Sequence, residues 1–467
     1  MTERKKRSRK DEHQADVSLP VSIRAHAPGY AGATFLTLFA AAFLLYLEYP
    51  LVSLAIALTS ITLIPFLAFT DRIVFDGRRL IRTGLLPKTW YRLNGLRTSI
   101  KLRSIEQIDT AIVGSFKRGG RVRFLHRTTV FGNAPSLIFA GSGARYRKMV
   151  ATLFAYLDPA LLDIRSYELS RFNVTPQEAV RAAAELNIPP SDVLETSLRS
   201  RPIPNNILIG RHDPRLTEGS NSELLRAAAN KLATAGLLVR ALEAFRRALH
   251  SQPKNARLLF EFSRCLHLLA FVRRNERFEH RAAAALRLAE KRADGDTDLL
   301  QRIAESYRQF GYTRRAANAY RAVIDRIGDG FRSLIGLAEL ALDEGKLAHV
   351  VHNFSAANRV ATTAAMRRWT SAEADYFTRL SGDDEYMELE LSRMNLLEKL
   401  DRWRRTAFRI GLYSLPLAAF GSFFGDELIA EAGWLVSSIG FLTWVGMNIG
   451  LRMLSPRIPY ELVESEK

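Results

Sequence analysis

The sequence predicts a multidomain membrane protein that combines four transmembrane helices, a small antiparallel β domain and an all-α solenoid of helical repeats. Three observations predict this fold class: four long uncharged stretches, a run of short strand patterns, and an internal helical period. The 467 residues are enough for two to four domains. The net charge of +19 implies an anionic neighbour, which could be nucleic acid, an anionic membrane leaflet or an acidic protein.

The chain begins with a basic segment, residues 1–29, which opens with MTERKKRSRK. No apolar stretch follows until Tyr30 and no small-residue cleavage site is evident, so we interpret this segment as a cytoplasmic tail rather than a signal peptide. The single cysteine, Cys265, excludes an intramolecular disulfide and fits a reducing compartment.

Two transmembrane hairpins are predicted, at residues 30–70 and 401–452. Their uncharged stretches come close to the roughly 20 residues that a membrane span requires. The alternative is a pair of buried helical hairpins in a soluble core, but buried soluble helices seldom stay uncharged for so long. The four stretches are 30–47, 51–70, 410–425 and 432–451.

Basic residues predict the orientation of these spans. Lys and Arg cluster at 4–10, 72–79 and 402–409 and recur at 452 and 457, whereas the two short connectors contain neither. The positive-inside rule therefore places both termini, including a C-terminal tail at 453–467, and the middle domains in the cytoplasm. We expect a multi-pass protein of a bacterial inner membrane.

Residues 71–158 are predicted to form the β domain. RIVFDGRRLIRTGLL reads as two strands joined by a turn at Asp76-Gly77, and SIKLRSIEQIDTAIVG, RVRFLHRTTVFG and SLIFAGSG continue the strand pattern. An amphipathic helix at 144–158 closes the domain. DGRRLIRTGLL, IKLRSIEQID and this helix resemble the bacterial pleckstrin-homology-like (PH-like) domains. The resemblance implies a scaffolding or membrane-proximal role rather than a fixed ligand.

The β domain also contains candidate residues for binding a lipid headgroup. Basic residues outnumber acidic ones by more than two to one between residues 71 and 171, and a basic surface is attracted to an anionic leaflet. A glycine-rich turn into a helix can bind phosphate through its backbone amides, although a simple strand-to-helix turn is the favoured interpretation of the pattern. The candidates are Gly141, Ser142, Gly143, Arg145, Arg147 and Lys148.

A helical linker at 159–220 is expected next, with a capped helix at TPQEAVRAAAELN and several prolines. Residues 221–400 are then predicted to form the solenoid. Small residues recur at Ala229, Ser263, Ala304 and Ala338, and the first and last intervals are both 34 residues. ALEAFRRALHSQP and AESYRQFGYTRRAANAYRAVI resemble the tetratricopeptide repeat (TPR), whose period is about 34 residues. In the second repeat, residues 273–280 read as an insertion in the turn.

Stacked repeats form a concave groove lined by the first helix of each pair. The TPR resemblance implies that Arg226 and Asn230 could hold a terminal carboxylate, but Glu261 and Asp298 depart from the rest of that clamp. The groove could bind an acidic segment of a partner, or its face could simply be solvated. The repeat alignment places on this face Arg226, Asn230, Arg264, His267, Gln301, Arg302 and Arg308.

No residue pattern predicts catalysis, a cofactor or a metal site. His349 and His352 are too few ligands for zinc, and no GxSxG, HExxH or CxxC motif occurs. We therefore expect a scaffold or adaptor that recruits a protein partner, rather than an enzyme. The alternative is a lipid-sensing or membrane-organising protein acting through the PH-like domain; nucleic-acid binding is less favoured because no recognition motif accompanies the charge.

Overall fold

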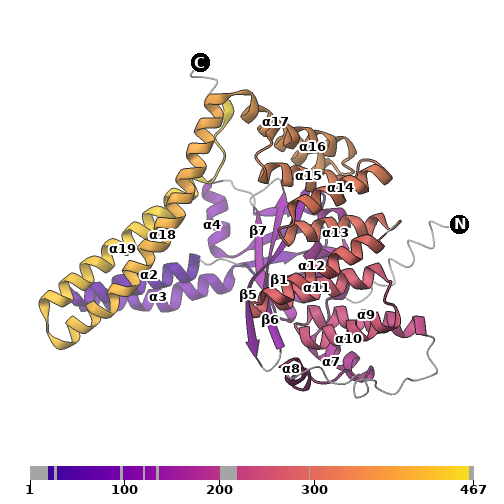
Figure 1. Cartoon of the computed structure of the whole chain (residues 1–467). Helices are drawn as coiled ribbons and strands as arrows, with labels where there is room; N and C mark the ends of the chain where they lie inside the picture. Colours follow the sequence, from indigo (N-terminus) through magenta and orange to yellow (C-terminus); the bar gives the residue numbers. More distant parts are fainter. Residues whose placement is uncertain are drawn as a thin grey trace. The chain divides into compact units, whose positions relative to one another are not determined.

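The computed structural model describes residues 19–25, 29–94, 98–118, 121–132, 136–199, 218–293 and 295–461. Outside these ranges lie most of the predicted basic tail, residues 200–217 of the predicted linker and residues 462–467 of the predicted C-terminal tail. The chain divides into two compact units, coloured by sequence in Figure 1. The repeat–sheet unit comprises Met1–His26 and Thr70–Ala372, and the helical-hairpin unit comprises Ala27–Phe69 and Glu373–Lys467.

Two antiparallel sheets form the first part of the repeat–sheet unit. The predicted hairpin at Asp76-Gly77 is confirmed: β2 pairs with β3, and Asp76 Oδ1 accepts hydrogen bonds from the backbone amides of Arg78 and Arg79. The four-stranded sheet contains, in spatial order, β1 (Val21–Arg24), β2 (Arg72–Phe75), β3 (Arg79–Thr83) and β4 (Ser99–Lys101); the other contains β5 (Ile105–Arg118), β6 (Arg121–Gly132) and β7 (Leu137–Gly141).

Strand β1 lies inside the segment that the sequence analysis treats as a tail. Its Val-Ser-Ile-Arg alternation buries Val21 and Ile23, and Arg24 pairs with Arg72 at the start of β2. Four residues are too few for a period of two to be distinguished in a basic segment. Helices α2 (Gly29–Tyr46) and α3 (Pro50–Thr70) are therefore inserted between two neighbouring strands of one sheet.

Helix α5 (Ala144–Ala155) covers the core that the two sheets share. Phe75 and Phe139 from the sheets and Met149 from α5 are fully buried in one cluster. Three further helices follow before the repeats: α6 (Ile164–Phe172), α7 (Pro176–Glu185) and α8 (Ser191–Arg199). Thr175 and Glu178 form a capping box at the start of α7, so the predicted helix entry is confirmed.

Eight helices then form four antiparallel pairs, a TPR-like solenoid. The four small residues that define the repeat, Ala229, Ser263, Ala304 and Ala338, are all fully buried, because each lies where the two helices of a pair approach closely. The pairs are α9 (Glu218–Thr234) with α10 (Leu238–Ser251), α11 (Ala256–Arg273) with α12 (Glu276–Arg292), α13 (Thr297–Gln309) with α14 (Thr313–Ile327), and α15 (Phe331–Asp343) with α16 (Leu347–Val360).

The second repeat differs from its predicted form. Its turn is short, at Arg274 and Asn275, and Arg274 adopts a left-handed conformation that ends α11. The additional residues lengthen the helices instead: α11 has 18 residues and α12 has 17, whereas α13 has 13 and α14 has 15. The predicted loop insertion is therefore wrong, because residues 276–280 continue a regular helix.

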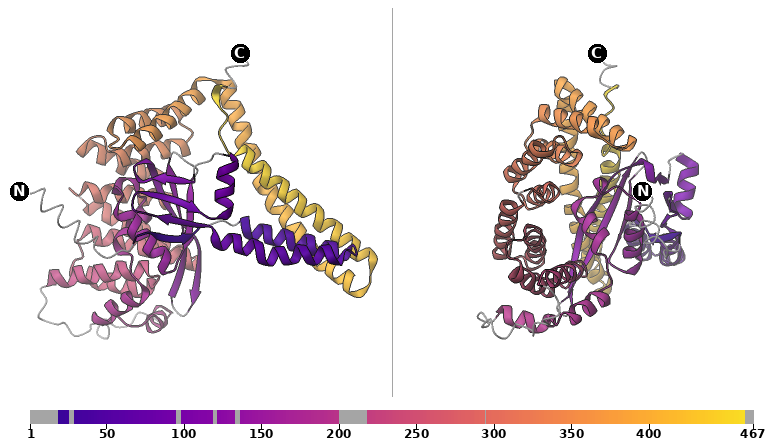
Figure 2. Two further views of the ribbon diagram at one scale, coloured as in Figure 1. Left: turned by 180° about the vertical axis from the view of Figure 1, so that it is seen from behind. Right: turned by 90° about the vertical axis from the view of Figure 1, so that its right-hand side faces the viewer.

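The strands and the solenoid share their cores. Val122 and Phe124 of β6 pack in one hydrophobic cluster with Leu232 and Leu238 of the first repeat, and Figure 2 shows the strands along the inner side of the arc of helices. The backbone amide of Val122 donates to the carbonyl of Gly236 in the α9–α10 turn, at 2.9 Å. The β domain and the repeats thus form one body rather than two linked domains.

The helical-hairpin unit contains α2, most of α3, part of α17 (Ala364–Gly382), and α18 (Asp384–Phe424) with α19 (Glu427–Leu454). Four of its helices, α2, α3, α18 and α19, are long and apolar enough to cross a membrane. Phe35 and Phe39 of α2 pack against Phe441 of α19 with ring centroids 5.0 and 4.8 Å apart. The predicted third span is the second half of α18, a single helix of 41 residues.

Candidate functional site: the inner face of the repeats

Arg226 and Asn230 lie together on α9, and both contact the chain's own Glu261. Arg226 makes a bidentate pair with Glu261 at 2.8 and 3.0 Å and a second ion pair with Glu223 at 2.7 Å. Asn230 Nδ2 donates to Glu261 Oε2 at 2.6 Å. Glu261, the residue that departs from the predicted carboxylate clamp, therefore supplies a carboxylate to both Arg226 and Asn230.

Helix α6 fills the middle of the groove. Arg264 of α11 forms a charge-assisted hydrogen bond with Glu168 of α6 and donates to Ser306 Oγ at 3.0 Å. Although burial raises the pKa of Glu168, the neighbouring Arg264 and Arg165 hold it below its ordinary value. The ion pair therefore keeps Glu168 charged inside the groove.

His267 lies beside this contact and is stacked on Phe310, with ring centroids 3.8 Å apart. Its Nδ1 atom is buried and makes no hydrogen bond within the described structure. Burial, together with the positive charge of Arg264, lowers the pKa of His267 to about 4. The imidazole is therefore neutral at physiological pH and packs as an aromatic ring.

Gln301 and Arg302 line an open part of the groove next to α6. The Arg302 guanidinium lies 3.8 Å above the ring of Tyr167 and pairs with Asp298 at 3.0 Å. These residues border a cavity of about 250 Å³. Its walls combine both signs of charge with apolar surface, and they come from Pro159, Ala160, Leu162, Ile164, Tyr167, Asp298, Gln301, Arg302, Glu305, Phe331 and Arg332.

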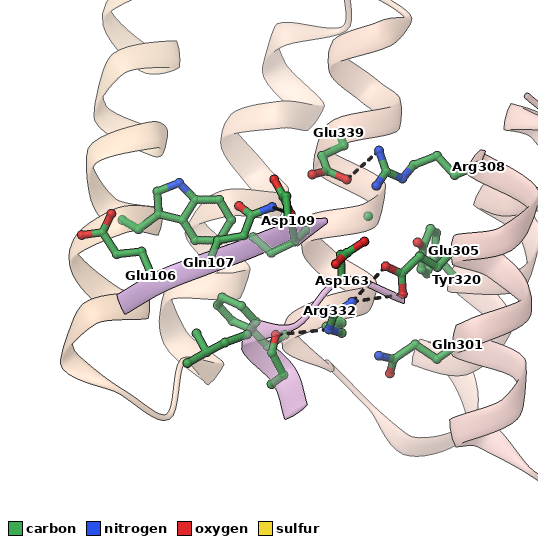
Figure 3. Close-up of a pocket in the computed structure, with 16 residues that line it drawn as sticks. Glu106, Gln107, Asp109, Asp163, Gln301, Glu305, Arg308, Tyr320, Arg332 and Glu339 are labelled. Atoms are coloured by element: carbon green, nitrogen blue, oxygen red, sulfur yellow. Dashed lines mark hydrogen bonds and ion pairs between the residues drawn. The ribbon is translucent and has the colours of Figure 1, made fainter. Parts of the chain in front are cut away.

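Arg308 belongs to a second, smaller cavity of about 60 Å³, where strand β5 meets α13 and α15 (Figure 3). It pairs with Glu339 at 3.1 Å, and Arg332 pairs with Glu305 at 3.0 Å. Five carboxylates and two guanidinium groups line this space, and Figure 3 shows Asp109 on the strand. Burial raises the pKa of both Asp109 and Glu339.

Asp163 explains why α6 enters the groove. Its carboxylate caps α6 by accepting from the amide of Ser166 at 2.9 Å, and it also accepts from the amide of Thr110 on β5 at 3.2 Å. The amide of the next residue, Ile164, donates to Glu305 of α13 at 3.0 Å. Burial raises the pKa of Asp163 to about 6 against the hydrogen bonds from Ser166.

The chain itself contacts the groove residues that the repeat alignment predicts. The four arginines pair with Glu261, Glu168, Asp298 and Glu339. The charge that suggested an acidic partner is balanced within the chain. Sequence reasoning missed Tyr167 and Glu168; the Asp163 cap before a short helix is the signal that could have found them.

The predicted lipid-headgroup residues lie where β7 leads into α5. Gly141 ends β7, Gly143 precedes α5, and the side chains of Arg145 and Lys148 are exposed. Ser142 contacts two arginines: Arg123 Nε donates to its hydroxyl at 2.6 Å and Arg147 Nη1 donates to its carbonyl at 3.0 Å. Burial and then the charge of Arg121 lower the pKa of Arg147, so three guanidinium groups gather here.

Other candidate chemistry is sparse in the part of the chain that the structure describes. No group of three or more His, Cys, Asp or Glu side chains there could hold a metal ion. Cys265 is buried within the first two repeats, and burial raises the pKa of its thiol, which disfavours the reactive thiolate.

The chain matches no protein-family model and no curated protein. Among solved structures, the crystal structure of MamA covers 29% of this chain and 76% of its own, at 18% identity and a TM-score of 0.26. The crystal structure of the APC/C hetero-tetramer Cut9–Hcn1 covers 67% and 53% at 13% identity and a TM-score of 0.30. MamA and Cut9 are TPR proteins. Since both TM-scores are low, the assignment of the solenoid rests on this chain's own helical pairs.

Proposed function

We propose that the protein is a membrane-anchored scaffold whose TPR-like solenoid recruits a protein partner at the cytoplasmic face of a bacterial inner membrane. The four apolar helices support the anchor, and the solenoid supports a role in protein–protein interaction. The PH-like resemblance is supported by two antiparallel sheets with a closing helix, α5.

The sheet supports the proposed topology of the first hairpin. Arg24 at the end of β1 pairs with Arg72 at the start of β2, so the two ends of the α2–α3 insertion lie about 5 Å apart across neighbouring strands. A helical hairpin whose ends are joined in this way enters and leaves a membrane on the same side. The basic flanks favour the cytoplasmic side.

The recruiting surface that we propose is the cavity of about 250 Å³ beside α6, and this observation carries the proposal. Most of the groove is occupied by α6 and the sheets, but this cavity stays open and is lined by two of the predicted residues, Gln301 and Arg302. Its apolar walls and balanced charges suit a partner side chain with an apolar body and a polar end, such as tyrosine or tryptophan.

Site-specific photo-crosslinking in native membranes tests this surface. A crosslinking residue replaces Asp298 at the rim, and a second variant adds Gln301→Trp to fill the cavity. We expect the crosslinker at Asp298 to form a covalent adduct with one protein. The adduct should be lost when Gln301→Trp is added. It should persist when the control Arg321→Trp, on the exposed side of α14, is added instead. An adduct that survives Gln301→Trp would contradict the assignment. Point variants are needed because deleting the repeats would also remove part of the sheet's core.

A second candidate function, binding of anionic lipid, is favoured by the arginines around Ser142. Arg121 Nε and Arg147 Nε are buried without a hydrogen-bond partner among the described residues, and like charges gathered in this way favour an anionic ligand. The test compares anionic lipid retained by the purified full chain in native mass spectrometry. We expect Arg121→Gln with Arg123→Gln to reduce retention, whereas Arg127→Gln on the same strand leaves it unchanged; equal retention in all three proteins would refute the site.

A further inference from the structure

A helix that the strand patterns did not predict, α4 (Leu85–Asn94), follows β3 and presents apolar side chains to solvent. It is amphipathic, and Leu85 and Leu86 are 50% and 41% exposed. Lys88 and Arg92 are exposed as well, whereas Pro87 is buried and lies close to Gly84. Two neighbouring leucines left in water indicate a surface that something else covers.

The register of the sheet places the start of α4 beside the end of α3. Thr83, the last residue of β3, pairs with Arg72, the first residue of β2. Gly84 packs so closely on this junction that an added Cβ would lie 3.0 Å from Asp71 Cα and 3.2 Å from the carbonyl oxygen of Thr70. Because Thr70 is the last residue of α3, the β2–β3 hairpin returns the chain to the point where that helix ends.

A buried ion pair fixes this junction. The guanidinium of Arg82 makes a bidentate contact with Asp71 at 2.6 and 2.9 Å, and the Asp71 side chain is 1% exposed. The amide of Ala25, next to β1, donates to the Asp71 carbonyl at 3.2 Å. Three chain segments therefore meet at Asp71, which leaves the start of α4 little freedom to move away from the end of α3.

We propose that α4 lies in the interfacial layer of the membrane, with Leu85 and Leu86 in the boundary between headgroups and acyl chains and Lys88 and Arg92 against anionic headgroups. The proposal rests on the membrane anchor proposed above: where α3 leaves the bilayer at Thr70, α4 begins at the bilayer surface. Its 10 residues span about 15 Å, so every turn stays near that surface. Amphipathic helices with this charge pattern bind in the plane of the interface.

The covering surface is the bilayer rather than a second protein because of continuity and charge. The start of α4 is fixed at the proposed exit point of a span, and basic residues flank the leucines. Exposed Lys and Arg side chains near an anionic leaflet strengthen membrane binding.

Three single cysteines in the full chain, in a Cys265→Ala background, test the proposal. Each carries an environment-sensitive fluorophore, and the protein is reconstituted in nanodiscs whose lipids carry a quencher at a shallow or a deep position. Leu86→Cys reports on α4. Leu58→Cys reports on α3, where Leu58 is 55% exposed, and Leu288→Cys on α12 serves as the matched control because Leu288 is an exposed leucine of the solenoid.

We expect the shallow quencher to reduce emission from Leu86→Cys, the deep quencher to reduce emission from Leu58→Cys, and neither to affect Leu288→Cys. If Leu58→Cys is quenched while Leu86→Cys behaves like Leu288→Cys, α4 does not contact the bilayer and the proposal is overturned, although the membrane anchor stands. If Leu58→Cys is not quenched, the anchor itself fails. If the fluorophore at Leu86→Cys reports an apolar environment but neither quencher reduces its emission, a protein partner covers the leucines. That result would also overturn the proposal.

Discussion

At the scale of single residues, the side chain that best separates a partner-binding groove from an internal contact is Arg264. Its side chain is only 5% exposed and pairs with Glu168, which is itself largely buried. Removing one member of a buried ion pair leaves the other charge without compensation, and such changes cost about 3–5 kcal/mol. A residue that only bound an external partner would be far less important for stability.

We therefore predict that Arg264→Ala lowers the thermal stability of the full chain strongly. The matched control is Arg257→Ala on the same helix, because Arg257 and its partner Asp296 are both 41% exposed and an exposed pair contributes about 0–1 kcal/mol. Differential scanning fluorimetry of both variants in detergent measures the difference. Equal melting temperatures for the two variants would show that the Glu168 contact does not hold α6 in the groove.

Asp163 makes stability depend on pH. Its folded pKa of about 6 is above the ordinary value of 3.8, so the folded state favours the protonated acid. The stabilising contribution of protonated Asp163 to the free energy of unfolding is fully present below pH 3.8 and is lost as the pH rises through 6. Burial raises the pKa of Asp109 and of Glu339 as well. The pKa of Glu168 is lowered instead, so its contribution to stability is present above its ordinary pKa of 4.5 and is lost as the pH falls below that value.

We predict that lowering the pH from 7.5 to 5.5 raises the contribution of Asp163 to the free energy of unfolding by about 1 kcal/mol. Asp163→Asn should remove that part of the pH dependence, because the amide does not titrate. Melting temperatures of both proteins across this range provide the measurement. Parallel curves for the wild type and Asp163→Asn would mean that the carboxyl is already charged throughout.

At the scale of elements, a single turn joins strand β6 to the first repeat. Gly236 has a φ of +83°, and a Cβ there would lie 1.7 Å from the carbonyl oxygen of Val122. Gly311 occupies the equivalent turn of the third repeat with a φ of +81°, but no heavy atom lies within 4 Å of its added Cβ. Both glycines therefore adopt the same left-handed backbone conformation, but only Gly236 contacts the sheet.

Gly311→Ala should cost about 1–2 kcal/mol, the usual penalty for a left-handed alanine. Gly236→Ala should cost about 1–3 kcal/mol more, because β6 must move away from the turn. Hydrogen exchange measured by mass spectrometry should show faster exchange in β6 for Gly236→Ala alone. If the β6 amides exchange equally slowly in both variants, the close approach of Gly236 to Val122 is not needed to hold β6 against the first repeat.

The packing of α18 against α19 provides a second prediction at this scale. Gly433 approaches α18 so closely that an added Cβ would lie 2.3 Å from the amide nitrogen of Ala418, whereas Gly446 on the same helix has no heavy atom that close. Small residues permit such approaches between membrane helices. We expect Gly433→Ala to lower the melting temperature in detergent and Gly446→Ala to leave it unchanged or slightly raised. Equal effects would place the helix contact elsewhere.

Elements marked by a long period, a turn or a helix cap could be predicted from the sequence, and short elements without such a signal could not. The repeat positions and the Asp76-Gly77 hairpin were confirmed because each is a local pattern sustained over many residues or fixed by one turn type. Strand β1 has four residues and α4 has ten, too few for a period to stand out. The added residues of α11 and α12 read as a loop in the sequence, because a run of charged residues is typical both of a loop and of the exposed face of a helix.

The candidate site was predictable only in part, for a physical reason. Repeat spacing places Gln301, Arg302 and their neighbours on one face, because helical periodicity is local. What covers that face depends on contacts between residues far apart in sequence, such as Glu168 with Arg264 and Ile164 with Glu305. No pattern within a single segment carries that information.

At the scale of the whole molecule, the helical hairpin α2–α3 is an insertion between two paired strands of the four-stranded sheet, which shares a core with the three-stranded sheet. The three-stranded sheet in turn packs against the first repeats. A single residue, Asp71, separates the end of α3 at Thr70 from the start of β2 at Arg72. For the membrane anchor proposed above, this connection requires that both ends of the hairpin lie on one side of the membrane.

Labelling of single cysteines in intact cells tests this topology most directly. A membrane-impermeant maleimide is applied to full-length variants in a Cys265→Ala background, with cysteines at Tyr49, Glu427 and, in the solenoid, Arg314. We predict that Tyr49→Cys and Glu427→Cys react in intact cells, whereas Arg314→Cys reacts only after lysis. Reaction of Arg314→Cys from the same side as Tyr49→Cys would contradict the account of a cytoplasmic scaffold held by two transmembrane hairpins.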